Sequence, residues 1–346
     1  MSISTLSILS APKKSVYESQ RQLVDAQKEL STGRHADVGL QLGGKTADAI
    51  ALRNGFDRNS SIIDINGLTA TELDLAQSSL TSLIDLVHQF SATLIGARNA
   101  QNGQEVVKTA AKSALESLGS LLNQSHSGKF LFAGINSDVA PLADYFSTPA
   151  SAGKSAVDAA FLAEFGVAQN GAGVTSITAA QMDTFLNGNF ANLFDPGGWS
   201  PAFSSASDQN RIARIDTDYN VEVSANANEA AFRDLTMAIT MAFDLGSGSL
   251  NQAAFEKLVD KAVTVSAAAA QEASLIAGRL GTAEKAISDS TERLKLRNDI
   301  LNREIVSLEG VDQYEVSTRI TLLTTQLEAS YSITARVSRL NLMNYL

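Results

Sequence analysis

The sequence has no cysteine, and its 346 residues include one tryptophan, three histidines and five prolines. Without cysteine, the chain can form no disulfide, thiolate zinc site or iron–sulfur cluster, and no thiol is available as a nucleophile. The three histidines, His35, His88 and His126, are too scattered to indicate a metal cluster. The sequence therefore predicts no cofactor and no bound metal.

Basic residues are also in deficit. Lysine and arginine number 27 against 37 aspartates and glutamates, which gives a formal net charge of −10. An acidic chain repels the phosphate backbone, so no nucleic-acid partner is predicted. No run of about 18 uncharged apolar residues occurs, so no membrane insertion is predicted. The first residues lack a basic stretch ahead of the apolar ones, so no cleaved signal peptide is expected.

The residues that are present divide the chain into three parts. Between 135 and 225 lie four of the five prolines, Trp199, and ten acidic residues against three basic ones. The flanks are rich in Ala, Leu, Ser, Gln and Glu and nearly free of proline. These patterns predict a mainly α fold, in which the N- and C-terminal segments form a long antiparallel coiled-coil helical rod with a small inserted α+β domain.

The expected segments follow from these boundaries. They are an N-terminal assembly helix and connector (1–44), the N-terminal half of the rod (45–134), the inserted α+β domain (135–225), the C-terminal half of the rod (226–310) and a C-terminal assembly helix (311–346). Inside the insert the sequence predicts helices at 155–165 and 178–193, the second one capped by Thr178. Alternating residues at 211–216 and 219–223 predict a hairpin, and the apolar run 130–132 predicts a short strand.

Heptad spacing marks the rod. Apolar residues recur at alternating steps of three and four within a helix expected from about 46 to 101, which Asn102-Gly103 ends, and a matching series follows in the C-terminal half. Such spacing keeps one apolar stripe facing a partner helix. The predicted rod seam comprises Leu73, Leu80, Leu83, Val87, Phe90, Leu94, Ile276, Leu280, Ile287, Leu294, Leu301 and Leu308.

The outermost segments, roughly 3–32 and 313–345, carry narrower apolar stripes. In the first segment, Lys13, Gln20 and Gln27 fill alternate core positions of the heptad pattern. Isolated helices of this kind are marginal in water, because ordering the backbone costs more than local bonds return. We expect them to be too polar to bury against their own chain and to become helical when identical neighbours cover them. The predicted assembly interface comprises Leu9, Val16, Leu23, Leu30, Val316, Ile320, Leu323, Leu327 and Val337.

One motif suggests different chemistry. Gly39–Thr46 (GLQLGGKT) matches the G-x-x-x-x-G-K-[ST] pattern of a phosphate-binding loop. A working loop of this type follows a buried strand of a parallel sheet, whereas the residues here, 31–38, are polar and turn-like. A nucleotide-binding enzyme is therefore disfavoured, and a glycine-rich connector leading into a helix is expected.

Several short motifs resemble bacterial flagellin and its hook–filament junction relatives. Leu30–Arg34 (LSTGR) resembles the turn after the family's first helix, and Phe130–Gly134 (FLFAG) resembles the strand before the insert. The segments Glu309–Asp312, Leu327–Tyr331 and Leu340–Leu346 (LNLMNYL) resemble the flagellin-like hook-associated protein more than flagellin itself. After Gly33 the chain departs from the family's usual Asn-x-x-x-Asp-Asp stretch.

The resemblance implies a structural protein of the bacterial flagellum and not an enzyme. It implies export through the flagellar type III apparatus, with an export chaperone, and an extracellular location without signal cleavage. A homo-oligomeric ring would join the hook to the filament, contacting a hook-side junction protein and flagellin. Two alternatives stay open: a flagellin that forms the filament, and a cytoplasmic coiled-coil scaffold.

Overall fold

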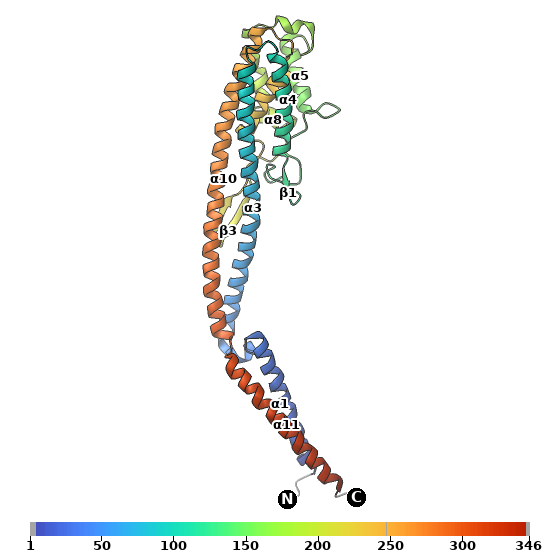
Figure 1. Ribbon diagram of the computed structural model, residues 1–346, viewed down its shortest axis with the longest axis vertical. Helices are drawn as coiled ribbons and strands as arrows, with labels where there is room; N and C mark the ends of the chain where they lie inside the picture. The colour runs from blue at the N-terminus through green and yellow to red at the C-terminus, as the bar shows by residue number, and fades with distance from the viewer. Residues whose placement is uncertain (1–4, 247, 344–346) are drawn as a thin grey trace. The chain divides into compact units, whose positions relative to one another are not determined.

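The computed structural model describes residues 5–246 and 248–343, which fall into two compact units (Figure 1). One unit combines Met1–Ser61 with Arg293–Leu346, and the other is Ile62–Glu292. The prediction of a mainly α chain with long helices is confirmed. The helices are α1 (Thr5–Thr32), α2 (Val38–Leu42), η1 (Gly43–Lys45), α3 (Thr46–Ala97), α4 (Gly103–Leu122), α5 (Ala152–Phe165), η2 (Ala172–Ser176), α6 (Ala179–Asn187), α7 (Asn189–Asn192), α8 (Pro196–Ala202), α9 (Ala230–Asp244), α10 (Gln252–Glu309) and α11 (Gln313–Met343).

Within the unit 62–292, the C-terminal part of α3 and the N-terminal part of α10 lie side by side in opposite directions (Figure 1). Gln77 donates to Glu284 at 2.6 Å, and Arg98 forms an ion pair with Asp260 at 2.7 Å. In the same unit α4 packs on α9. Opposed long helices with an apolar seam are what the heptads predicted.

The segment 135–225 shares a core with these helices instead of forming one of its own. Phe146 lies edge-on to Phe243 of α9, with ring centroids 5.2 Å apart, and Trp199 donates its indole N–H to Asn228 at 2.9 Å. One continuous cluster of buried apolar side chains runs from the insert through α4, α9 and α10. The inserted segment therefore packs in a core shared with α4 and α9, because its aromatic rings fill the space beside them.

Two local predictions need correction. The run 130–132 is not a strand: β1 (Ser125–His126) pairs with β2 (Lys129–Phe130) across Ser127 and Gly128, both at positive φ. Phe132 leaves the ladder because it is fully buried in the core. The single helix expected over 178–193 is broken at Gly188 into α6 and α7, although the Thr178 cap forms as a capping box with Gln181.

The predicted hairpin is confirmed as β3 (Ile212–Asp216) paired antiparallel with β4 (Tyr219–Glu222). It is fixed to the long helices through one carbonyl. The oxygen of Ile215 accepts from Asn66 of α3 at 3.0 Å and from Ser290 of α10 at 2.7 Å. A buried carbonyl with two donors is fully satisfied, so this contact holds the hairpin against both helices.

In the other unit, α1 and α11 pack against each other in opposite directions (Figure 1). Gln20 donates to the Tyr331 hydroxyl at 2.6 Å, and Arg319 pairs with Glu29 at 2.7 Å. The chain breaks between α10 and α11 at Gly310, and Asp312 caps α11 by accepting from the amide of Tyr314 at 2.8 Å. The expectation that the terminal stripes bury nothing against their own chain is therefore wrong, since each helix supplies half of a small seam.

Candidate assembly surface

The seam between α1 and α11 is small. Ala26, Val316 and Leu323 form its buried cluster, with Leu23 and Ile320 packed partly buried against it. Leu327 is also buried. Four buried apolar side chains are few for two helices of this length. On the described part of the pair, each helix therefore buries only one narrow face.

The outward faces of the same helices carry apolar and aromatic side chains in water. Tyr17 and Val24 of α1, and Leu322 and Ile333 of α11, are each exposed by half or more. Isolated exposed apolar residues are normal on a protein surface, but a series along paired helices marks a site of protein association. The pair therefore offers a second apolar surface, separate from its inner seam.

The predicted interface residues are divided between these two surfaces. Val316, Leu323 and Leu327 lie in the inner seam, and Val16, Leu23 and Ile320 are half-buried, whereas Leu30 is exposed. The side chains of Leu9 and Val337 lie outside the described residues, as do the last three residues of the LNLMNYL ending.

The outward residues do not belong to the single apolar stripe predicted from the sequence for each segment. Tyr17 and Val24 are spaced by seven, parallel to the chosen stripe, and Leu322 adjoins Leu323. A search for a second stripe with the same period would have found them.

The rod seam residues are placed in two groups. In the unit 62–292, the side chains of Leu73, Leu80, Leu83, Val87, Phe90, Leu94, Ile276, Leu280 and Ile287 are buried in one cluster. In the other unit Leu294 is buried, while Leu301 and Leu308 are half-buried.

A polar pair interrupts the apolar seam in the part of α3 and α10 that belongs to the terminal unit. Asn59 and Asn298 are buried, and the Asn59 amide donates to Asn298 Oδ1 at 3.0 Å. Asn298 in turn donates to the Ser60 hydroxyl at 3.0 Å. A buried asparagine pair in a coiled coil costs stability but specifies register and partner, because other alignments leave its amide unsatisfied.

The loop-like motif Gly39–Thr46 is helical in the structure. It forms α2, η1 and the start of α3, and the Thr46 hydroxyl donates to the Gly43 carbonyl at 2.7 Å. The carboxylate of Asp37 caps α2 and accepts the Leu40 amide at 2.8 Å. An acid bound to an amide of the loop occupies a donor that a phosphate would need, so this geometry does not suit a nucleotide.

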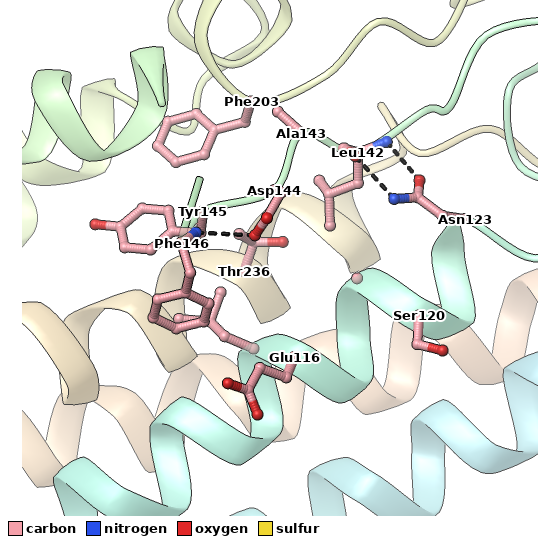
Figure 2. A pocket seen from close by; sticks show the side chains of 12 residues that line it. Glu116, Ser120, Asn123, Leu142, Ala143, Asp144, Tyr145, Phe146, Phe203 and Thr236 are labelled. Carbon is pink, nitrogen blue, oxygen red and sulfur yellow. Dashed lines mark hydrogen bonds between the residues drawn. The ribbon is translucent and has the colours of Figure 1, made fainter. Parts of the chain in front are cut away.

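A cavity of about 400 Å³ lies between α4 and residues 142–146 (Figure 2). Two of its polar wall groups are bonded to nearby backbone: Asn123 exchanges two hydrogen bonds of 2.9 Å with the backbone of Leu142, and Asp144 accepts from the Phe146 amide. Beside it, the Tyr145 hydroxyl donates to Asp244 at 2.6 Å, and burial raises the pKa of Asp244. These hydrogen bonds stabilise the fold, and among them no nucleophile is aligned with a base.

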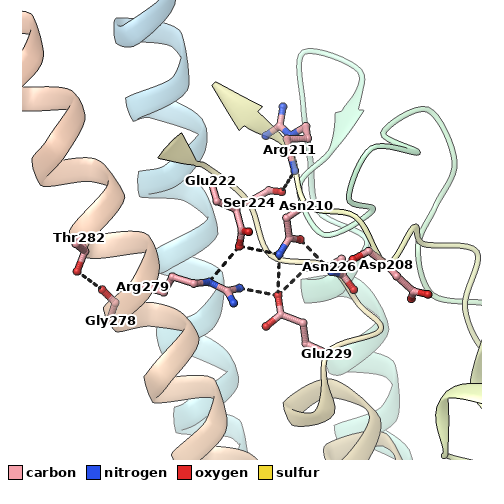
Figure 3. Close-up of polar contacts among 10 residues, drawn as sticks. All are labelled: Asp208, Asn210, Arg211, Glu222, Ser224, Asn226, Glu229, Gly278, Arg279 and Thr282. Atoms are coloured by element: carbon pink, nitrogen blue, oxygen red, sulfur yellow. Dashed lines mark hydrogen bonds and ion pairs between the residues drawn. The ribbon is translucent and has the colours of Figure 1, made fainter. Parts of the chain in front are cut away.

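Polar contacts also join the hairpin, the start of α9 and α10 (Figure 3). Arg279 pairs with Glu229 at 2.7 Å and with Glu222 at 3.4 Å, and the buried Asn226 donates to Asn210 at 2.9 Å. These groups satisfy one another's hydrogen-bonding capacity, so the cluster holds the hairpin, α9 and α10 together.

No group of three or more potential metal ligands is found among the residues that the structure describes. Across the same residues, no helix has an apolar stretch long enough to pass through a lipid bilayer.

Comparisons with known proteins agree with the helical architecture. The model of the bacterial flagellin N-terminal helical region matches residues 3–137, and the model of the C-terminal helical region matches residues 263–346. A solved structure from Vibrio parahaemolyticus, assigned as a flagellar hook-associated protein, is similar at 16% identity and a TM-score of 0.39, covering 73% of this chain and 97% of that chain. A comparison with curated protein sequences gave no match.

The two flagellin models together match more than half of the chain, in the N-to-C order of the family, and they cover both terminal helices and much of α3, α4 and α10. The chain therefore belongs to the bacterial flagellin family, whose members are structural, non-enzymatic components of the flagellum that assemble into polymers.

Proposed function

We propose that this protein is a hook-associated subunit, exported without signal cleavage and assembled as a ring that joins the hook to the filament. The observation that carries the proposal is the α1–α11 pair, with its small inner seam and its outward apolar residues. A surface of this kind is stabilised when copies of the same chain, a hook-side protein and flagellin cover it.

Two C-terminal segments favour a junction subunit over a filament subunit. The segments Leu327–Tyr331 and Leu340–Leu346 resemble the junction protein more than flagellin. A flagellin remains the second candidate, because both matching family models describe helical regions of bacterial flagellin.

The two candidate functions predict different polymerisation behaviour of the purified protein. We expect purified protein, mixed with isolated hooks and viewed by electron microscopy, to form a short cap on the hook end and no long filament. Flagellin added afterwards should then extend from the cap. Long filaments of this protein alone would establish the flagellin alternative, and absence from hooks altogether would favour the cytoplasmic scaffold.

A matched pair of variants on α11 tests the surface itself. Leu322→Asp places a charge on the outward face, and we expect it to abolish cap formation because burying an unpaired carboxylate is costly. Thr324→Asp adds the same charge at an exposed position of α11 about 200° around the helix from Leu322, and it should retain the cap. Equal loss in both variants, with helicity unchanged, would show that added charge and not the apolar surface is responsible.

A further inference from the structure

The two breaks in the terminal unit, residues 33–37 and 309–312, lie against each other. Arg34 and Gly310 form an isolated antiparallel bridge. The amide of His35 donates to the Glu309 carbonyl at 3.0 Å, and the amide of Val311 donates to the Gly33 carbonyl at 3.1 Å. The end of α1 and the start of α11 are therefore joined at one place.

Glu309 is the most buried charged side chain at this place, at 1% exposed. It accepts two hydrogen bonds from Arg53 of α3, one of them at 2.7 Å from Nε, and the Nε of Arg34 lies 3.9 Å from its second oxygen. The hydrogen bond from Arg53 lowers the pKa of Glu309, against the opposing effect of burial. A carboxylate this deeply buried is stable only while its arginines remain in place.

Glu29, at the end of α1, makes an equivalent set of contacts. It accepts from Arg319 of α11 at 2.7 Å and from the Ala36 amide at 3.1 Å, and the Nδ1 of His35 is 3.7 Å away. Glu309 and Glu29 thus connect α1, the connector, α3, α10 and α11 through charged contacts.

Apolar packing contributes little here. Neither α2 nor η1 has a buried residue, and the apolar cluster of the terminal pair is centred on Ala26, Val316 and Leu323, with Val311 at its edge. Directional charge-assisted bonds are therefore the main contacts that fix the connector.

We propose that Glu309 and Glu29 form an ionic clasp that locks the α1–α11 pair to the adjoining ends of α3 and α10. With the clasp closed, the two breaks behave as one rigid joint. With either carboxylate uncharged, the pair turns about residues 33–37 and 309–312 while each helix stays folded. This device does not depend on the proposed place of the protein in the flagellum.

Because the chain has no cysteine of its own, spin labels attach only to cysteines that are introduced for the test. Spin labels on cysteines introduced at Asn302 of α10 and Thr325 of α11, both exposed, report the distance across the joint by pulsed electron paramagnetic resonance. We expect a narrow distribution in the parent chain and in the control Glu304→Gln, which changes an exposed acid of α10. Glu309→Gln and Glu29→Gln, which keep the side-chain shape, should broaden it.

Hydrogen exchange supplies a second readout. Amides at 34–45 and 310–316 should exchange about tenfold faster in Glu309→Gln than in Glu304→Gln, with α3 and α10 unchanged beyond the joint. A Glu309→Gln distribution as narrow as that of the control would overturn the proposal. Loss of helicity throughout α10 in that variant would also overturn it, because Glu309 would then be needed for folding of the rod and not for the joint alone.

Discussion

Two glycines of α4 illustrate how far single residues are constrained. A Cβ atom added at Gly103 would lie 1.9 Å from the carbonyl oxygen of Ala97, which is backbone and cannot move aside cheaply. At Gly119 nothing lies within 4 Å of that position. The first glycine is required by the close turn between α3 and α4, and the second is not.

Gly103→Ala is therefore expected to lower the free energy of unfolding by about 1–3 kcal/mol, through strain at the turn. Gly119→Ala should raise it by up to about 1 kcal/mol, because alanine is the better helix former. Chemical denaturation of both variants compares them directly. Equal effects of the two changes would contradict this account of the turn.

Glu272 of α10 is partly buried and subject to the negative charge of Asp234 of α9. Burial raises the pKa of both groups, Asp234 raises that of Glu272 further, and Glu272 Oε2 is a buried atom without a hydrogen-bond partner. A raised carboxyl pKa means that the folded state favours the protonated acid. The group's favourable contribution to the free energy of unfolding is therefore present at low pH and is lost as pH rises through the raised pKa.

Glu272→Gln should accordingly raise the melting temperature at pH 7, and the gain should disappear as pH falls toward 4.5, the ordinary value for glutamate. Glu292→Gln, an exposed acid of the same helix, should have no comparable effect. Thermal melts across pH 4 to 8 check the sign. A gain that persists undiminished at pH 4 would mean that packing and not charge is responsible.

At the scale of elements, the helices were largely predictable and the insert was not. Heptad spacing at Leu73–Leu94 and the Asn102-Gly103 break are local signals, so helix type and ends followed from them. The burial of Phe132, and the break of the 178–193 helix at Gly188, depend on what packs from elsewhere in the chain. No local pattern encodes that information.

The same limit applies to the candidate site. The inner residues Val316 and Leu323 follow from one periodic stripe. The contacts of Glu29 and Glu309 join positions about 290 and 256 residues apart along the chain. Such contacts arise only after α1 has paired with α11 and α3 with α10, so spacing along the sequence does not indicate them.

Because the insert and the rod share a core, removing one large ring should weaken both. Trp199 is fully buried, stacks on Phe203 at 5.3 Å and bonds to Asn228 beside α9. Trp199→Ala is expected to cost about 3–5 kcal/mol and to lower the unfolding midpoint of the unit 62–292 as a single transition. Calorimetry that resolves an unchanged rod transition would show two independent cores.

At the scale of the whole molecule, the described residues of the terminal pair bury only a small apolar cluster. Leu327 lies in the inner seam and Leu322 on the outward face, so the two positions separate folding of the pair from its association. The proposal that the pair is covered by neighbours therefore makes a different prediction for each face.

Leu327→Asp should disrupt α1–α11 pairing itself and abolish assembly, while leaving α3, α4, α9 and α10 folded. Circular dichroism should lose only the terminal helical signal, and a strain carrying the variant should be non-motile. Normal motility in that strain would show that the inner seam is dispensable.

Hydrogen exchange on the dilute, unassembled protein, followed segment by segment, tests the central claim most directly. We predict that amides of α1 and α11 exchange much faster than those of α4, α9 and the adjoining parts of α3 and α10, and that they become protected once the protein is bound to hooks. If the terminal helices of the isolated chain were already as protected as the central helices, neighbouring copies would not be needed to stabilise them, and the account would be contradicted.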